Sequence, residues 1–266
     1  MKFSLLALLF YYILAFPVSA QTGTTLFPQN RIYQKYYADA ISHQFSLLKH
    51  FESNEWFGNI GINKPLMNLG AVDNPYQLTF AATVFSTLKI TPPHVQVFTA
   101  DYLVDIFLDK KIANNLIMRF NWGHLSAHYS DDGILQLNKT SINYVRDYIS
   151  VQGEKLINQL HGKIYAAATF NFHNEPRKNK HFTFQVGFDA GKQINENLLL
   201  YFAFDFKAKA EVNYGTTKNF QIGIKFPTKS QSDIRIAYTY RTGYEERGQL
   251  YNQTDNKNLI GIYLDF

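Results

Sequence analysis

The sequence predicts an all-β fold, an antiparallel transmembrane β-barrel of about 12 strands. From about residue 77 onward, apolar and polar residues alternate with a period of two in segments separated by polar turns. This is the pattern of β-strands with one apolar face. Aromatic residues make up 16% of the chain and recur near the ends of these segments, as in the aromatic girdle of a membrane barrel. The chain has no cysteine, so its stability must come from a large core or from a membrane rather than from disulfides.

The N-terminal segment has the features of a secretory signal peptide. Lys2 precedes an apolar run from Leu5 to Phe16, and small residues follow up to Ala20, where a signal peptidase would cleave. The run is shorter than the roughly 20 apolar residues of a spanning helix. We therefore predict that residues 1–20 export the chain and are removed. No cysteine follows the cleavage site, which argues against a lipoprotein anchor.

Residues 21–40 precede the first predicted strand, and we expect them to form a periplasmic leader that plugs or braces the barrel. The barrel domain is predicted to span residues 41–266. Its strands are expected at about 41–51, 57–66, 77–88, 96–107, 116–128, 141–152, 161–172, 181–190, 198–209, 217–226, 233–243 and 258–266. This number is even, as a closed antiparallel barrel with both termini in the periplasm requires. The longer connections, 129–140, 173–180 and 244–257, then lie on the extracellular side.

The C-terminus distinguishes a membrane barrel from a soluble β-sandwich, in which the apolar strand faces point inward. The residues NLIGIYLDF end on Phe266, with Ile260, Ile262 and Leu264 on the same face. This ending resembles the C-terminal strand of bacterial outer-membrane proteins, which the barrel assembly machinery reads. Together with the export signal, it predicts an outer-membrane β-barrel located in the bacterial outer membrane of a Gram-negative cell.

Charged residues are expected to face the lumen of this barrel. The formal net charge of +5 is spread along the chain, which is too diffuse for a nucleic-acid partner. Charges of both signs lie on the polar strand faces, at Arg119, Asp205, Lys207, Lys225, Arg235 and Arg241. This mixture favours a salt-bridged interior over a wide pore, so we expect poor conductance.

One predicted strand carries two residues typical of catalysis on its apolar face. In the segment Leu116–Asp132, His124 and Ser126 share a face with Phe120 and Trp122. If this face contacts lipid, the pair lies where an esterase that acts on membrane lipids needs it. Residues i and i+2 of a strand have Cα atoms roughly 6.6 Å apart, close enough for the histidine to take the serine proton. The alternative is that both are interfacial residues of an aromatic girdle.

A serine nucleophile and a histidine base need a third group that holds the other ring nitrogen. Asn143 and Asp147 share the lipid-facing side of the next predicted strand. We expect Asn143 to be this orienting residue, with Asp147 as the alternative. Arg146 and Asp131 or Asp132 are candidates for an oxyanion contact or for Ca²⁺ ligands near the lipid head groups. Ca²⁺ is the one cofactor that the sequence suggests.

The histidines of this segment do not predict a zinc site. His124 and His128 lie four strand residues apart, roughly 13 Å, whereas two ligands of one zinc ion lie within about 4 Å of each other. A site formed by His128 with Asp131 across the turn is left open. The sequence therefore predicts no metal site with confidence beyond the Ca²⁺ candidates.

Four short motifs resemble a family of bacterial exported proteins known as domain of unknown function 1207 (DUF1207). They are LFP at 26–28, YADA at 37–40, FTADY at 98–102 and HLSAHYSDD at 124–132. The last motif is similar to H-x-S-S-H-x-G-D-E in that family, and this sequence departs from it at Ala127, Ser130 and Asp132. The resemblance spans most of the chain and implies an outer-membrane barrel without an assigned activity.

A narrower resemblance concerns function. Outer-membrane phospholipase A and the lipid A 3-O-deacylase carry H-x-S on a lipid-facing strand, and the phospholipase adds an Asn in S-x-N on the next strand. His124-Leu125-Ser126 and Ser141-Ile142-Asn143 are similar to these two patterns. The resemblance implies a serine-dependent lipid acyl-ester hydrolase, an esterase or phospholipase that acts on outer-membrane phospholipid or lipid A.

The alternative hypothesis is a non-catalytic barrel, either a narrow channel or a structural or scaffolding protein. Whether the chain is an enzyme therefore stays open at this point. The expected partners are outer-membrane lipids and the barrel assembly machinery, which would recognise Phe266. A homodimer is compatible with either hypothesis.

Overall fold

The structure, a computed structural model, describes residues 22–228 and 233–265. The predicted signal peptide and the terminal Phe266 lie outside the described residues. The strands are β1 (Thr22–Leu26), β2 (Phe45–His50), β3 (Glu55–Ala71), β4 (Tyr76–Thr91), β5 (His94–Ala113), β6 (Leu116–Tyr129), β7 (Tyr144–Ile157), β8 (Gly162–Glu175), β9 (Phe182–Asn195), β10 (Leu198–Lys209), β11 (Gly215–Phe226), β12 (Asp233–Tyr244) and β13 (Thr254–Asp265). Short helices are α2 (Asp131–Leu137), η1 (Asn158–Leu160), η2 (Ala210–Val212) and η3 (Gly248–Leu250).

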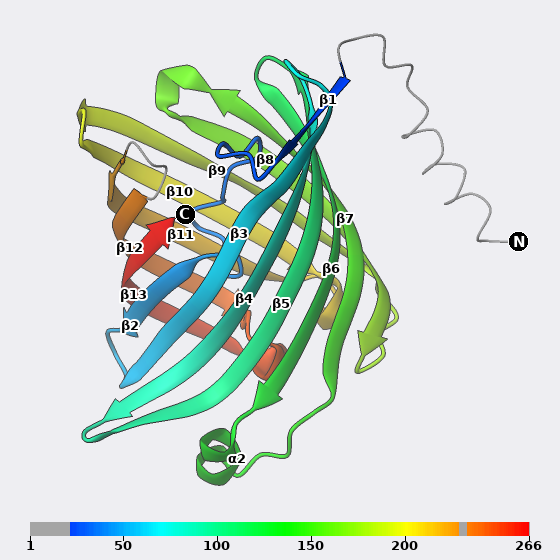
Figure 1. The fold of residues 1–266 in the computed structure, drawn as a ribbon. Helices are drawn as coiled ribbons and strands as arrows, with labels where there is room; N and C mark the ends of the chain where they lie inside the picture. The colour runs from blue at the N-terminus through cyan, green and yellow to red at the C-terminus, as the bar shows by residue number, and fades with distance from the viewer. Residues whose placement is uncertain (1–21, 229–232, 266) are drawn as a thin grey trace, which may run out of the picture.

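These strands form one antiparallel sheet that closes on itself (Figure 1). From β2 to β13 each strand pairs with the next one along the chain, and β13 pairs with β2. The described residues thus form a closed 12-strand barrel with β1 as one extra strand, which pairs with the far end of β3. The predicted fold class is confirmed. None of the described helices is long and apolar enough to span a membrane.

The strands β3, β4 and β5 are longer than predicted, at 17, 16 and 20 residues. Apolar and polar residues no longer alternate where both faces of a strand carry polar residues, as at Lys110 and Lys111 of β5. Backbone pairing continues past that point, where Lys110 pairs with Tyr76. Hydrophobic patterning therefore identifies the lipid-facing part of each strand and misses its polar extension.

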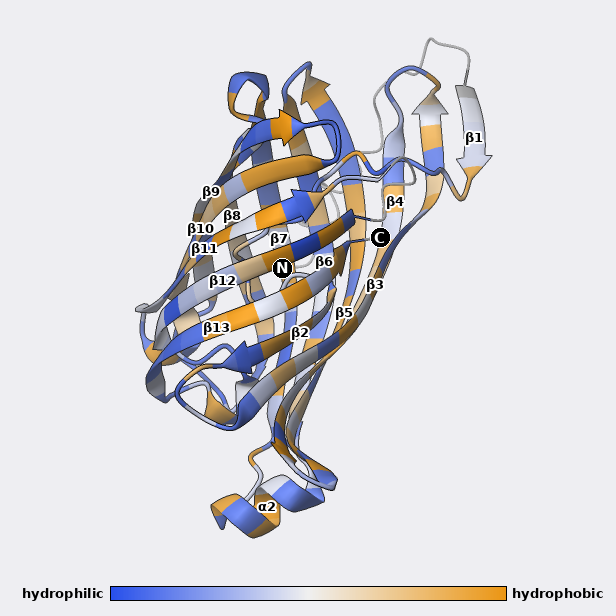
Figure 2. Ribbon diagram, turned by 90° about the vertical axis from the view of Figure 1, so that its left-hand side faces the viewer, coloured by the Kyte–Doolittle hydropathy of each residue, from blue (hydrophilic) through white to orange (hydrophobic). Residues whose placement is uncertain are grey.

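The side chains of the barrel wall alternate between an outer and an inner face. In β12, Ile234 and Ile236 are exposed on the outside, whereas Arg235 between them is completely buried inside. Figure 2 shows the resulting alternation of hydrophilic and hydrophobic residues along β12 and β13. Apolar side chains outside and polar ones inside are typical of a barrel surrounded by lipid, and they exclude the soluble sandwich.

The lumen is crossed by ion pairs, as the sequence predicts. The four shortest pairs that involve predicted lumen residues are Arg235–Asp265 at 2.5 Å, and Arg119–Asp109, Lys207–Asp39 and Lys225–Asp233 at 2.6 Å. Arg241 donates to the side-chain oxygen of Asn219 at 3.0 Å. Because each of these charges has a partner within the wall or the lumen, the interior needs little water to satisfy them.

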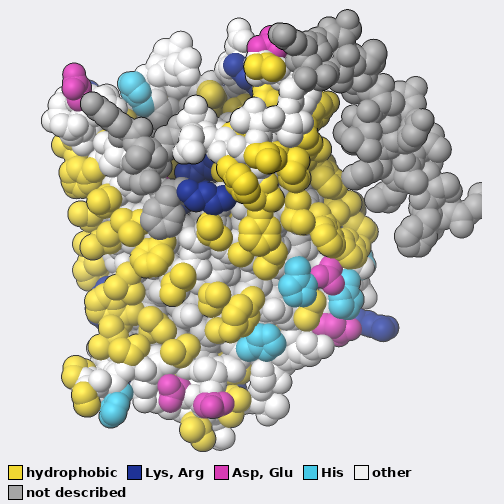
Figure 3. Space-filling model, viewed as in Figure 1, with side chains coloured by type: hydrophobic (Ala, Val, Ile, Leu, Met, Phe, Trp, Pro, Cys, Tyr) yellow, Lys and Arg dark blue, Asp and Glu magenta, His cyan; other side chains and the backbone are white. Residues whose placement is uncertain are grey.

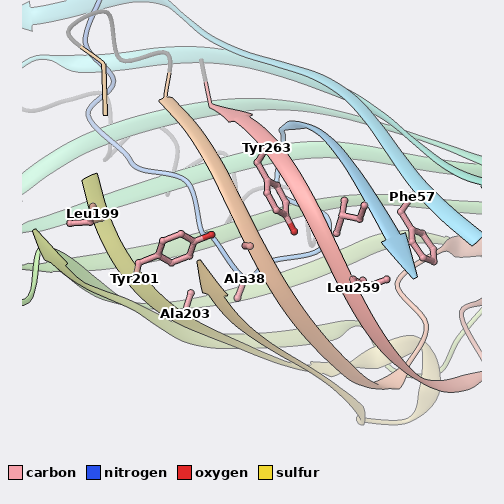
Figure 4. Close-up of a cluster of buried hydrophobic side chains, with 9 residues drawn as sticks. Ala38, Phe57, Leu199, Tyr201, Ala203, Leu259 and Tyr263 are labelled. Carbon is pink, nitrogen blue, oxygen red and sulfur yellow. The ribbon is translucent and has the colours of Figure 1, made fainter. Parts of the chain in front are cut away.

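The segment between β1 and β2 lies inside the barrel from Tyr33 onward. Tyr33 and Tyr36 are buried, and the ring of Tyr36 stacks on Tyr165 of the wall with centroids 3.5 Å apart. Figure 4 shows Ala38 of this segment near Tyr201 of β10, with which it packs in a cluster of buried side chains. The predicted leader therefore fills the lumen, and it also contributes a strand, β1, that the sequence does not predict.

The same segment continues into the predicted first strand. The sequence predicts a strand from residue 41, but β2 begins only at Phe45. His43 lies in the lumen instead, where its ring contacts Thr83 and Asp105 at 2.9 Å and 2.6 Å. These polar contacts hold the His43 ring against the inner side of β4 and β5. A cavity of about 180 Å³ is lined by this segment together with residues of β3 and of β5 to β10.

Candidate functional site

Three polar side chains form a row across the outer surface of β6, β7 and β8. The strand register places Asp147 of β7 opposite His124 of β6 on one side and opposite His173 of β8 on the other. Nδ1 of His124 lies 2.6 Å from Oδ1 of Asp147, and Nδ1 of His173 lies 2.7 Å from Oδ2. The His side chains are about half exposed, at 49% and 51%, and the carboxylate between them is 28% exposed.

The two hydrogen bonds determine which ring nitrogens carry protons. An ionised carboxylate only accepts hydrogen bonds, so both imidazoles must donate from Nδ1. A neutral ring that donates from Nδ1 has an unprotonated Nε2, which can act as a base. Figure 3 shows histidine and acidic side chains gathered on the outer face of the barrel, in the lower right of the view and below a broad hydrophobic surface. The row therefore offers two basic nitrogens at the edge of an apolar wall.

Ser126 lies two residues after His124 on the same outward face of β6. It is half-buried and pairs with Val145 of β7. The two residues make no hydrogen bond with each other in the described chain, but their Cα atoms are roughly 6.6 Å apart by strand geometry. Catalytic hydrogen bonds often shorten only when substrate is bound, and rotation about one side-chain bond brings a serine hydroxyl towards its neighbour.

The strand register selects between the two predicted orienting residues. Asp147 contacts His124 directly. Asn143 precedes the start of β7 at Tyr144 and is exposed. It lies four residues before the carboxylate, roughly 13 Å along the chain direction. Asn143, the first choice from the sequence, is therefore too far from the imidazole to hold it.

The predicted oxyanion and Ca²⁺ contacts do not gather at Ser126. Arg146 is 4% exposed and faces the lumen, where its Nε donates to Glu211 at 3.0 Å. The barrel wall separates it from the outward-facing serine, so this prediction is wrong. Asp131 and Asp132 begin α2, and a carboxylate oxygen of Asp132 accepts from the Val97 amide at 3.1 Å.

The described residues contain no group of three or more His, Asp or Glu that could hold a metal ion. In particular, Asp132 is already used to attach α2 to β5. Calcium prefers six to eight oxygen ligands, and the donors present here do not provide such a set. The described residues therefore do not fit the suggested Ca²⁺ site, and no step of the chemistry below uses one.

His173 is not predicted as a site residue from the sequence. The predicted strands leave it in an extracellular connection, and continued period-two alternation from Phe170 would point its side chain into the lumen. In the structure β8 extends to Glu175, and the pairing with β7 shifts between Tyr148–Asn171 and Asp147–His173. Phe172 is the extra residue, so two consecutive side chains point outward. Such a β-bulge leaves no trace in the hydrophobic pattern.

Comparisons with known proteins identify a family and a set of similar barrels. The model of the family described as "Protein of unknown function (DUF1207)" matches residues 33–266. No curated protein matches the sequence. Among solved structures, outer membrane phospholipase A from Escherichia coli superposes with a TM-score of 0.55 and 14% identity. The match covers 88% of this chain and 99% of the phospholipase.

Two further solved structures have the same architecture. The outer membrane phospholipase of Salmonella typhi, a dimer with bound calcium, has a TM-score of 0.53 and 13% identity, covering 87% of this chain and 94% of that one. The KdgM porin has a TM-score of 0.50 and 11% identity, covering 85% of this chain and 99% of the porin. At these identities the similarity concerns the fold, and it includes both an enzyme and a porin.

Proposed function

Because this chain belongs to the DUF1207 family and is an outer-membrane β-barrel of the bacterial outer membrane, we propose that it hydrolyses acyl esters of lipids in that membrane. The observation that carries the proposal is the hydrogen-bonded pair His124–Asp147 beside Ser126 on the lipid-facing wall. These are the three chemical groups of a serine hydrolase, a hydroxyl, an imidazole and a carboxylate.

Each residue has a definite role in the proposed reaction. His124 Nε2 takes the proton from Ser126 Oγ, which attacks the acyl carbon of the ester. The ester C–O bond breaks, and the alcohol of the lysolipid leaves with the proton from His124. Water then attacks the acyl-enzyme with the same base and releases the fatty acid. Asp147 holds the Nδ1–H tautomer and stabilises the imidazolium that forms in each half-reaction.

The surroundings of the site favour a lipid substrate. Trp122 is 55% exposed and Phe172 is 49% exposed on the same outer surface, so acyl chains can contact them directly. The polar row lies towards the α2 end of the strands, where the longer connections are. In outer-membrane barrels these connections are extracellular, which puts the serine near the outer-leaflet head groups. Phospholipid and lipid A both carry acyl esters at this level.

The proposal is tested by lipid hydrolysis with purified full-length protein in detergent micelles. Wild-type protein should release fatty acid from phospholipid or lipid A, and Ser126→Ala should reduce the rate at least about 10³-fold, as for a lost nucleophile. Ser86→Ala is a matched control because Ser86 is also a half-buried serine on the outer face of a strand, β4. Equal turnover by wild type and Ser126→Ala would overturn the assignment.

The second candidate function is a narrow channel. The similarity to the KdgM porin and the cavity of about 180 Å³ in the lumen favour it. Planar bilayer recordings would then show conductance steps that change when a lumen charge such as Arg235 is replaced. Conductance without lipid hydrolysis would identify the channel. If the protein shows neither conductance nor hydrolysis, the structural or scaffolding barrel is the remaining hypothesis.

A further inference from the structure

The carboxylate of Asp147 is held at both of its oxygens. His124 occupies Oδ1 and His173 occupies Oδ2, each through Nδ1. A serine hydrolase needs only the first of these bonds. The second one comes from a different strand, and it leaves the carboxylate with little freedom to rotate about its side-chain bond.

The backbone of β8 is irregular at the point that places His173 there. In a regular register Phe172 would lie opposite Asp147, and the next residue would face the lumen. The bulge at Phe172 turns His173 outward while the neighbouring Asn174 returns to the buried side. Bulges of this kind often redirect a side chain next to a functional site.

The bulge is held in place by His181 at the start of β9. The backbone oxygen of His181 accepts from the Asn171 amide at 2.9 Å and from the Asn171 side chain at 3.1 Å. Its ring Nδ1 donates to the Asn171 carbonyl at 2.9 Å. These contacts hold Asn171, the residue directly before the bulge, which makes the outward position of His173 a built feature of the wall.

We propose that His173 is a positioning residue, which orients Asp147 so that the carboxylate keeps His124 in the Nδ1–H tautomer. Its effect on hydrolysis rests on the function proposed above, but the tautomer itself does not. Asp147 is partly exposed, so water competes for its oxygens. Because His173 donates to Oδ2, water cannot bind at that position, and Oδ1 stays directed towards His124.

The first test measures the tautomer without any substrate. In protein with ¹⁵N-labelled histidine, in detergent micelles at alkaline pH, His124 should be in the Nδ1–H form. His173→Ala should give His124 a mixture of tautomers. His173→Asn should restore the Nδ1–H form, because the asparagine amide can donate to Oδ2 from a similar position. His94→Ala, at an exposed histidine in the β4–β5 turn, should have no effect.

The second test measures kinetics on the same variants. His173→Ala should lower kcat about 10-fold or more, the usual cost of losing a partner that orients a functional group, with KM unchanged. His173→Asn should recover most of that loss. A merely structural role would affect both variants alike and would reduce the folded fraction, which circular dichroism measures.

The two tests separate the failure of this inference from that of the proposed function. If wild-type protein shows no hydrolysis but His124 changes its tautomer in His173→Ala and not in His173→Asn, the positioning role stands and the enzyme assignment fails. If the tautomer of His124 is the same in wild type and His173→Ala, the inference is overturned, whatever the activity.

Discussion

At the scale of single residues, the outer wall carries a charge that is costly unless it is paired. A carboxylate facing lipid destabilises a barrel, most of all near the middle of the membrane. Asp147 avoids this cost because two imidazoles donate to it. The two hydrogen bonds thereby compensate the carboxylate at the edge of the apolar surface.

The first prediction at this scale concerns Asp147. Asp147→Ala removes the acceptor of His124, and we expect kcat for lipid hydrolysis to fall about 10²–10⁴-fold. Asp147→Asn should lose a similar amount, because its amide nitrogen can donate to Nδ1 of His124 and thereby select the wrong tautomer. The measurement is the rate of fatty-acid release at saturating substrate, with folding checked by circular dichroism.

Asn143→Ala is the variant that discriminates between the two orienting residues. Asn143 is exposed and lies before β7, so its replacement should leave kcat within about twofold of wild type. A large loss in Asn143→Ala, with Asp147→Ala still active, would return the orienting role to Asn143.

At the scale of elements, the connection between β12 and β13 folds back into the mouth of the barrel. Its η3 segment places the Gln249 side chain where it donates to the Ala127 carbonyl at 2.6 Å and to the Ile142 carbonyl at 2.8 Å. Glu245 at the start of the connection is buried and accepts from Lys257 at 2.5 Å. Gln249 and Glu245 thereby attach this connection, which the sequence predicts to be extracellular, to the β6 and β13 strands.

The burial of Glu245 predicts a loss of stability in acid. Burial by itself raises the pKa of this carboxyl, but the positive charges of Lys257, Arg241 and Arg247 outweigh it and lower the pKa to about 2. Since this folded pKa is below 4.5, the ordinary pKa of a glutamate carboxyl, the stabilisation is complete above about pH 4.5 and is lost as the pH falls towards 2.

Denaturant unfolding in micelles at pH 7, 5 and 3 measures this effect. Wild-type protein should lose more free energy of unfolding between pH 5 and 3 than Glu245→Gln does, because glutamine does not titrate. Parallel losses in the two proteins would show that other carboxyl groups cause the acid sensitivity.

At the scale of the whole molecule, the N-terminal segment and the barrel form one structure. Besides Lys207, Asp39 of this segment accepts from the Gln185 side chain at 3.1 Å and from the Ile41 amide at 3.1 Å. Lys35 pairs with Asp265 of β13 at 3.3 Å. These contacts connect the segment to β9, β10 and β13, so it acts as an internal brace across the lumen.

Removal of one brace contact should destabilise the entire barrel. Asp39→Ala leaves the buried ammonium of Lys207 without its closest partner, which costs roughly 3 kcal/mol of unfolding free energy. Asp255→Ala is the control, because Asp255 also pairs with a lysine, Lys257, but its side chain is 52% exposed; its loss should cost about 1 kcal/mol or less. Unfolding by urea in micelles measures both, and equal midpoints for the two variants would contradict the brace.

The sequence by itself determined the barrel and the face on which the candidate site lies. Period-two alternation assigns each residue of a strand to the inside or the outside, and this assignment was enough to place His124, Ser126 and Asp147 outward and Arg235 inward. It also limits the orienting residue to Asn143 or Asp147, since both share that face. The family motifs and the C-terminal pattern indicate the membrane in which such a barrel is found.

Only the tertiary structure decided which of these outward residues meet. Alternation carries no information about the register between strands, because register depends on backbone pairing and on turns whose lengths the sequence does not reveal. The pairing of β6 with β7 puts Asp147 at His124, and one extra residue, Phe172, brings His173 to the same carboxylate. The position of residues 33–44 inside the lumen likewise depends on contacts with distant strands, such as Asp39 with Lys207, which no local pattern encodes.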